Sequence, residues 1–131
     1  MAGEAVDVAR RLLESDFSKW PAGAIELMTE DVVLSTSDGK VYVGHAGCAQ
    51  WYENNVRTIE SREYIPYRLE QLDEHWILGA GAARNQLRDG EVEMQPGCWL
   101  IRVSDGLVSA FLYYRTVEIA RDALAERLTR M

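Results

Sequence analysis

The sequence lacks any stretch in which basic residues gather, and it lacks a long hydrophobic run. Its longest basic cluster is Arg10-Arg11, inside a segment whose spacing predicts a helix. The chain carries a formal net charge of −7, so it repels a phosphate backbone and nucleic acid is not an expected partner. No apolar run approaches the roughly 20 residues needed to cross a bilayer, and we therefore expect no membrane partner.

Cysteine and histidine are also scarce. The cysteines are Cys48 and Cys98, and the N-terminal residues lead into an amphipathic segment rather than the apolar core of a signal peptide. This pattern predicts a cytoplasmic protein with both thiols reduced. His45 and Cys48 have an i, i+3 spacing that could hold a metal ion, but no third ligand is evident. We expect neither a metal nor another cofactor.

The composition is that of a globular domain with a substantial core. Of the 131 residues, 47% are hydrophobic and 27% are charged, which is ordinary for a folded chain of this length. The sequence contains no linker, low-complexity segment or internal repeat. We therefore interpret residues 1–131 as a single domain.

Helical spacing is present at both ends of the chain and once in between. Apolar residues recur at intervals of three and four over 4–15, 45–60 and 117–129, which predicts three amphipathic helices. Pro21 suits the first turn of a further short helix, whose apolar residues extend to Met28.

The remaining segments have the alternation and composition of strands. Residues 31–37 are rich in β-branched side chains, and Asp38-Gly39 predicts a hairpin turn that returns along 40–43. Four long strands are predicted at 63–73, 75–87, 91–104 and 107–116. Short turns make sequential strands antiparallel. The predicted fold is α+β: a curved antiparallel meander wrapped around N-terminal helices as a cone-shaped barrel, with a C-terminal helix and a pocket inside.

This order of elements is similar to the SnoaL-like and ketosteroid-isomerase-like domains of the nuclear transport factor two (NTF2) superfamily. Residues 24–33 resemble the family's second helix running into its first strand, residues 44–52 its third helix, and residues 102–108 its last hairpin. The resemblance implies a pocket for a small organic molecule. The family includes polyketide cyclases, isomerases, dehydratases and epoxide hydrolases, so the fold does not specify the chemistry.

The resembling enzymes place acidic side chains inside the cone, but the matching positions here are not acidic. The isomerase-like base falls near Thr36, the acid that stabilises the oxyanion near Cys98, and the tyrosine of the first helix near Leu12. The epoxide-hydrolase-like positions fall at Ala82-Ala83-Arg84 and at Tyr113. Because threonine and tyrosine are poor bases near neutral pH, we expect neither steroid isomerase nor epoxide hydrolase activity.

Alternation along the strands sorts side chains between the two faces of the sheet. If Arg84 points inward, Trp76 and Gln86 do too, and Tyr113 brings Phe111 and Arg115 with it. The candidate ligand-binding residues are Trp20, Trp51, Tyr67, Trp76, Arg84, Gln86, Cys98, Phe111, Tyr113 and Arg115. The alternatives are plain core packing for the aromatic residues and, for Arg84, an internal ion pair or a solvent-facing position.

The opposite face of the sheet would then be apolar. It would carry Trp99, Ile101, Leu112 and Tyr114 on neighbouring strands. An apolar patch of this kind is not expected to remain in water. We therefore predict a homodimer through this outer face, and a protein-interaction module is the weaker alternative.

The expected function follows from the arginines and the phenol placed inside the cone. Arg84, Arg115 and Tyr113 would make the cavity electropositive within an acidic protein. We expect a SnoaL-like protein that binds an aromatic or polyketide-like ligand of acidic or phenolic character. The alternative is an enzyme of cyclase, isomerase, dehydratase or hydrolase type in which Arg84 and Tyr113 polarise a substrate oxygen.

Overall fold

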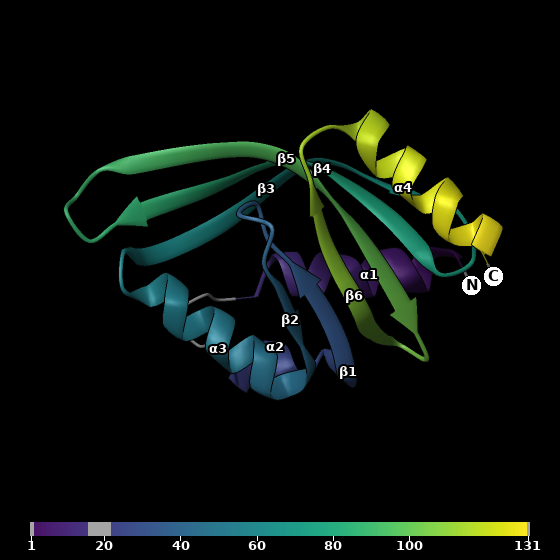
Figure 1. The fold of residues 1–131 in the computed structure, drawn as a ribbon, viewed down its shortest axis with the longest axis horizontal. Coiled ribbons are helices and arrows are strands. Elements are labelled where there is room, and N and C mark those ends of the chain that lie inside the picture. The colour runs from purple at the N-terminus through teal and green to yellow at the C-terminus, as the bar shows by residue number, and fades with distance from the viewer. Residues whose placement is uncertain (1, 16–21, 131) are drawn as a thin grey trace.

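Six strands form one curled sheet with helices on both of its faces (Figure 1). The structure, a computed structural model, describes residues 2–15 and 22–130. The elements are α1 (Ala2–Leu13), α2 (Ala22–Ile25), β1 (Met28–Ser35), β2 (Val41–Val43), α3 (Gly44–Val56), β3 (Ile59–Gln71), β4 (Trp76–Leu87), β5 (Val92–Ser104), β6 (Leu107–Tyr114) and α4 (Val117–Arg130).

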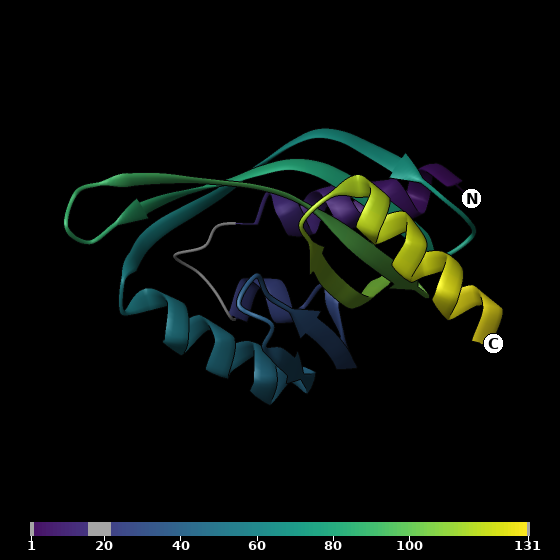
Figure 2. The same ribbon diagram turned by 45° about the horizontal axis from the view of Figure 1, so that its top comes forward.

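The predicted cone-shaped α+β fold is confirmed. The strand order is β2-β1-β6-β5-β4-β3, and β3 to β6 form the expected antiparallel meander. β1 adds a parallel pair with β6, which makes the sheet mixed. Sequence pattern did not reveal this pair because its two strands are separated by most of the chain. The curl of the long strands around α1 is visible in both ribbon views (Figures 1 and 2).

Several predicted boundaries differ from the structure by a few residues, and one of these differences concerns the site. The helix predicted over 45–60 ends at Val56, and β3 already begins at Ile59. Arg62 therefore belongs to a strand rather than to a helix–strand junction. The helix predicted after Pro21 has only 4 residues, since Met28 already starts β1. Pro21 itself lies outside the described residues.

The concave face of the sheet packs against α1 and α3. Buried residues of α1, including Ala9 and Leu12, join Ile77, Trp99 and Ile101 of the strands in one core cluster. Gly79 of β4 lies beneath Leu69 of β3, where a Cβ would stand only 3.1 Å away, and Leu13 of α1 packs nearby at 3.9 Å. The missing side chain at position 79 therefore leaves room for Leu69 on the concave face.

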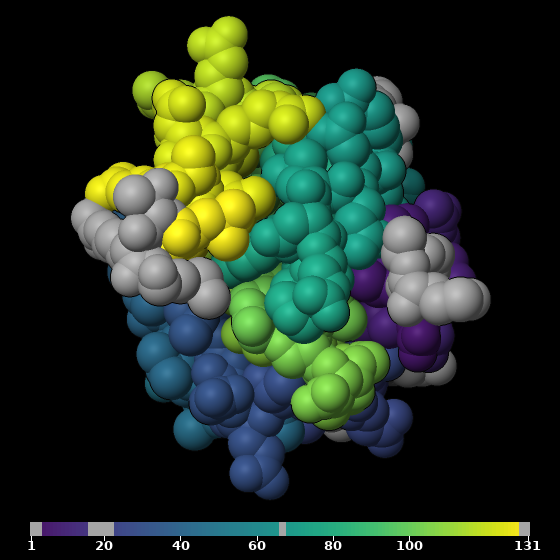
Figure 3. Space-filling model, turned by 90° about the vertical axis from the view of Figure 1, so that its right-hand side faces the viewer, coloured from purple at the N-terminus to yellow at the C-terminus, as the bar shows by residue number. Residues whose placement is uncertain are grey.

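The convex face has its own cover, α4. Ala120 and Leu124 of this helix form a second core cluster with Trp76, Leu78 and Leu100 of the sheet. Figure 3 shows the helix (yellow) lying against the neighbouring strands (teal). The Arg127 guanidinium lies 5.9 Å from the centre of the Trp76 ring, and Arg121 pairs with Glu70 of β3. The C-terminal helix thus seals apolar surface on the side of the sheet opposite α1.

This arrangement corrects the predicted facing of β4. Arg84, Gln86 and Trp76 share a face, as alternation requires, but that face is the convex one. Trp76 is buried beneath α4, whereas Arg84 and Gln86 are exposed. The error has a physical reason: β4 is buried on both faces over most of its first half, so hydrophobicity does not distinguish its two sides.

The facing of β5 is corrected in the same way. Trp99 pairs with Tyr113 across the ladder, so these two side chains share the concave face. Cys98 lies on the convex face, in the cluster under α4.

The patch proposed for a homodimer therefore does not exist as a continuous outer surface. Trp99 and Ile101 belong to the concave core. Leu112 is buried in the convex cluster, and Tyr114 packs against that cluster. The predicted dimer loses the residues on which it was based. In the part of the chain that the structure describes, no helix is long and apolar enough to cross a membrane.

The cover formed by α4 generates a test of stability. Leu124→Ala should lower the free energy of unfolding by about 2–3 kcal/mol, because it removes a buried side chain from the convex cluster. The matched control on the same helix is Leu128→Ala, whose side chain is 43% exposed and should cost less than about 0.5 kcal/mol. Urea unfolding would measure both. Equal small losses would mean that α4 does not hold the convex face in solution.

Candidate functional site

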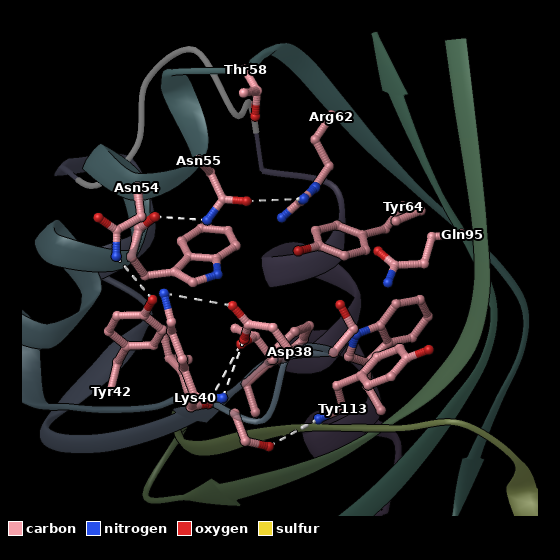
Figure 4. A pocket seen from close by; sticks show the side chains of 18 residues that line it. Asp38, Lys40, Tyr42, Asn54, Asn55, Thr58, Arg62, Tyr64, Gln95 and Tyr113 are labelled. Atoms are coloured by element: carbon pink, nitrogen blue, oxygen red, sulfur yellow. Dashed lines mark hydrogen bonds and ion pairs between the residues drawn. The ribbon is translucent and has the colours of Figure 1, made fainter. Parts of the chain in front are cut away.

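A cavity of about 250 Å³ opens between the concave face of the sheet and α3 (Figure 4). Every strand of the sheet, α3 and the turn between β1 and β2 contribute to it. Its apolar and aromatic lining consists of Leu34, Trp51, Tyr64, Ala83, Trp99, Phe111 and Tyr113. Its polar lining consists of Ser35, Thr36, Ser37, Asp38, Lys40, Tyr42, Asn54, Asn55, Thr58, Arg62 and Gln95. An aromatic wall with a few converging polar groups is typical of small-molecule sites.

The aromatic wall is a packed cluster on three strands. The Tyr64 ring meets the Trp99 ring edge-on at 5.3 Å and the Phe111 ring at 5.9 Å. Trp99 lies stacked with Phe111 at 6.3 Å and edge-on to Tyr113 at 6.2 Å. Edge-to-face pairs at these separations are attractive beyond their buried area. The rings therefore hold one another and form a preformed surface for a flat ligand.

Tyr113 keeps its place in this wall because β5 has a glycine beneath it. A Cβ at Gly97 would stand 2.5 Å from Tyr113 Cε2 and 2.9 Å from its hydroxyl oxygen. The Tyr113 hydroxyl donates to the Pro96 carbonyl at 3.1 Å. The Tyr113 ring therefore lies against Gly97, and its hydroxyl already donates to a carbonyl. Tyr113 contributes its ring to the cavity wall more than its hydroxyl group.

The cation on the inner side of the cavity is Arg62. Its Nε donates to Asn85 Oδ1 at 2.7 Å and its Nη2 to Asn55 Oδ1 at 3.1 Å. The guanidinium lies 5.3 Å from the centre of the Trp51 ring, and Asn55 is itself tied to the Trp51 carbonyl by a 2.7 Å bond. Amide oxygens and an aromatic face together fix the guanidinium plane.

Two polar side chains in the cavity are open to a ligand. Among the described residues, neither the Tyr64 hydroxyl nor the Gln95 amide has a hydrogen-bond partner. Figure 4 shows the Tyr64 hydroxyl directed toward the middle of the cavity, beside Arg62, with Gln95 on the same side. The Tyr64 hydroxyl and the Arg62 guanidinium thus lie where one ligand oxygen could meet both, and Gln95 lines the cavity farther along the Tyr64 ring.

The rim carries a pair of opposite charges in the β1–β2 turn. Asp38 accepts hydrogen bonds from the Thr36 hydroxyl and, at 3.2 Å, from the Lys40 amide. The Lys40 ammonium is 3.8 Å from the Asp38 carboxylate, and both side chains are more than half exposed. The hydrogen bond from Thr36 holds the pKa of Asp38 below its usual value against the small opposing effect of burial. Asp38 is therefore a carboxylate that stays ionised.

Some predicted site residues do meet in the cavity. Trp51, Phe111 and Tyr113 line it, and so does Thr36, which the resemblance placed at the isomerase base. Asp38 lines it as well, although the sequence indicated only a turn at this position. Their role toward a ligand stays a prediction.

Other predicted residues lie elsewhere. Trp76, Arg84, Gln86 and Cys98 are on the convex face, and Arg115 is exposed beyond the end of β6, where alternation no longer applies. Trp20 lies outside the described residues, and so does the side chain of Tyr67.

Sequence reasoning missed Arg62, Tyr64 and Asn85. Arg62 and Tyr64 have the two-residue spacing of a shared strand face, but that signal was hidden because the helix was predicted to continue to residue 60. Asn85 is a polar residue on the concave face of β4, and only the corrected facing brings it next to Arg62.

The paired positions of His45 and Cys48 do not build a metal centre. His45 Nε2 lies 3.3 Å from the Met28 carbonyl, and Cys48 Sγ lies 3.5 Å from the Met28 sulfur. The described residues contain no group of three His, Cys, Asp or Glu side chains able to hold a metal ion.

The close approach of Gly97 and Tyr113 can be tested by a double-mutant cycle. Gly97→Ala should lower the free energy of unfolding by about 1–3 kcal/mol, because the new methyl group must displace the phenol ring. In a Tyr113→Ala background the same substitution should cost much less, since the methyl group then has room. Chemical unfolding of the four proteins gives the coupling. An equal cost in both backgrounds would contradict the contact.

The two thiols should be inert in the folded protein. Burial raises the pKa of Cys48 to about 11 and also raises the pKa of Cys98, so little thiolate is present at neutral pH. We expect a disulfide reagent such as dithionitrobenzoate to titrate no thiol at pH 8 until denaturant is added, and then to titrate both. Rapid labelling of the native protein would contradict the buried positions.

Solved structures show what fold this geometry belongs to. A putative polyketide cyclase from Xanthomonas campestris pv. campestris is similar with a TM-score of 0.76 and 16% identity, over 91% of this chain and 95% of that one. A ketosteroid-isomerase-like protein from Catenulispora acidiphila, solved with trimethylamine, has a TM-score of 0.70 and 12% identity, over 89% and 88%. A computationally designed 17-OHP binder has a TM-score of 0.70 and 17% identity, over 88% and 95%.

No protein-family model and no curated protein matches the sequence. The likeness is therefore one of fold, and further similar structures are described as NTF2-like proteins. The three structures align with this chain over 88 to 91% of its length. The chain has the cone-shaped α+β fold of NTF2-like, ketosteroid-isomerase-like and polyketide-cyclase-like structures.

Proposed function

We propose that the cavity binds a compact aromatic molecule that carries an acidic or phenolic oxygen. The observation that carries this proposal is the open Tyr64 hydroxyl beside Arg62, at the edge of an aromatic wall. The ligand ring would lie against Trp99 and Phe111, and its oxygen would receive hydrogen bonds from Tyr64 and the guanidinium. Arg62 takes the role that the sequence had suggested for Arg84.

The size of the cavity limits the ligand. Its volume of about 250 Å³ lies just below the range of roughly 300–1,000 Å³ typical of small-molecule sites. A computationally designed protein of similar fold is described as a 17-OHP binder, so this fold can be made to bind a small molecule. In this chain the packed rings of Trp99, Phe111 and Tyr113 occupy part of the cone, which favours a molecule of one or two rings.

Charge favours an anion over a cation. Among the described residues of the lining, Arg62 and Lys40 carry positive charge and Asp38 carries the one carboxylate. Lys40 lies beside that carboxylate. The Catenulispora protein was solved with trimethylamine, whose protonated form is a cation. We expect such a ligand to be disfavoured here, because it would lie near the Arg62 guanidinium.

An enzyme is the second candidate, and Asp38 is the observation in its favour. A carboxylate that could accept a proton lines the same cavity as two groups that could polarise a substrate oxygen, Arg62 and Tyr64. The lowered pKa of Asp38 makes it a weak base. For this reason we place binding before catalysis.

Isothermal titration calorimetry with benzoate, salicylate and 2-naphthoate tests the proposal. Wild type should bind at least one of them, and Arg62→Met should weaken binding about 10- to 150-fold, the equivalent of a charge-assisted hydrogen bond of about 1.5–3 kcal/mol. Tyr64→Phe should weaken binding about 2- to 10-fold through loss of one neutral hydrogen bond.

The matched control is Arg84→Met, which removes the same charge from the convex face of β4 and should leave binding unchanged. Trimethylamine serves as the cationic comparison and should not bind. Failure of all three aromatic acids to bind wild type, or equal losses in Arg62→Met and Arg84→Met, would contradict the proposal. Conversion of a bound acid or phenol, lost in Asp38→Asn, would make the enzyme the better description.

A further inference from the structure

Asn85 stands out in the part of the chain that the structure describes, because it is the one fully buried polar side chain there. It is 1% exposed and lies on the concave face of β4, two residues beyond Ala83 of the cavity wall. Burying an amide is unfavourable unless both of its ends are hydrogen-bonded. An apolar side chain would occupy this position without that requirement, so the amide needs an explanation.

Both ends of the amide are bonded, and the chemistry of the partners fixes its orientation. Arg62 Nε donates to Asn85 Oδ1 at 2.7 Å, and Asn85 Nδ2 donates to Glu93 Oε1 at 3.2 Å. A guanidinium has donors only and an ionised carboxylate has acceptors only, so the amide cannot turn over without losing both bonds. The Glu93 carboxylate also polarises the amide and strengthens the oxygen that faces Arg62.

Asn85 is a neutral partner for a charged group. It holds Nε of Arg62, while Asn55 holds Nη2 and the Trp51 ring supports the guanidinium plane. A carboxylate at position 85 would hold the same nitrogen but would also oppose the guanidinium charge at close range. An amide fixes the geometry and adds no negative charge. This difference between an amide and a carboxylate matters if the Arg62 charge attracts a ligand into the cavity.

We propose that Asn85 is a positioning residue that makes the cavity select an anionic ligand over its neutral isostere. The ligand class is an aromatic carboxylate, and Asn85 acts through Arg62 without touching the ligand. The inference rests on the proposed function, since it specifies how the same site recognises its ligand. It adds a relay from Glu93 on the exposed β4–β5 hairpin through Asn85 to the cavity.

The test is a discrimination ratio measured by calorimetry, with 2-naphthoate and 2-naphthamide as probes. These molecules have nearly the same shape and differ in charge. Wild type should prefer the carboxylate, and Asn85→Asp should lower that preference about 10-fold by weakening naphthoate binding. Naphthamide binding should change by less than about 2-fold. A residue with a merely structural role would weaken both probes alike.

Glu93→Ala is the second variant, because it leaves Arg62 and Asn85 in place and removes only the acceptor that fixes the Asn85 amide. It should lower the preference about 2- to 5-fold, because the freed amide holds the Arg62 guanidinium less firmly. The Nε–H signal of Arg62 in a ¹⁵N NMR spectrum provides a readout without ligand, and it should shift in both variants.

The outcomes separate the two proposals. If wild type binds 2-naphthoate and Arg62→Met abolishes the preference, but Asn85→Asp and Glu93→Ala leave the ratio at the wild-type value, the positioning role is overturned and the binding function stands. A shifted Arg62 signal with an unchanged ratio leads to the same conclusion. If neither probe binds wild type, the proposed function fails and the inference fails with it. If Asn85→Asp does not fold, Glu93→Ala decides.

Discussion

The register between β4 and β5 is the constraint on which the rest of the structure depends. On the concave face, Trp99 of β5 is paired with Gly79 of β4 and Gln95 with Ala83, so these two large side chains of β5 each meet a small residue. The small residues of β4 leave space on the concave face, and α1 and the aromatic rings pack into that space. A slip of one residue would turn Trp99 to the convex face and bring Cys98 inside.

The apolar and the polar groups of the site come mostly from different parts of the fold. The aromatic wall stands on paired strands and is braced ring against ring, so its shape does not depend on a ligand. Most of the polar groups come from the start of β3, from α3 and from the β1–β2 turn, and Gln95 comes from β5. Two amide oxygens accept hydrogen bonds from the inner guanidinium, whereas the rim carries an ion pair exposed to solvent. Solvent screening weakens the pair at the rim far more than contacts deeper inside.

The sequence was sufficient to predict the fold because its signals were local. Amphipathic spacing gave the helices and Asp38-Gly39 the hairpin, and short turns gave the antiparallel order. The facing of the strands was not predictable in the same way. Trp76 and Trp99 are both apolar and both buried, yet α4 covers one and the concave core holds the other. Only contacts between distant segments decide which is which, and Arg62 could be recognised only after β3 was extended to Ile59.

The placement of the tryptophans has an optical consequence. Trp51 and Trp99 border the cavity, whereas Trp76 lies on the opposite face of the sheet beneath α4. An aromatic guest that absorbs in the near ultraviolet would take excitation energy from the first two indoles over a few ångströms and from Trp76 over a longer path. Ligand binding would therefore change the intrinsic tryptophan fluorescence, and Trp76, on the far side of the sheet, would be affected least.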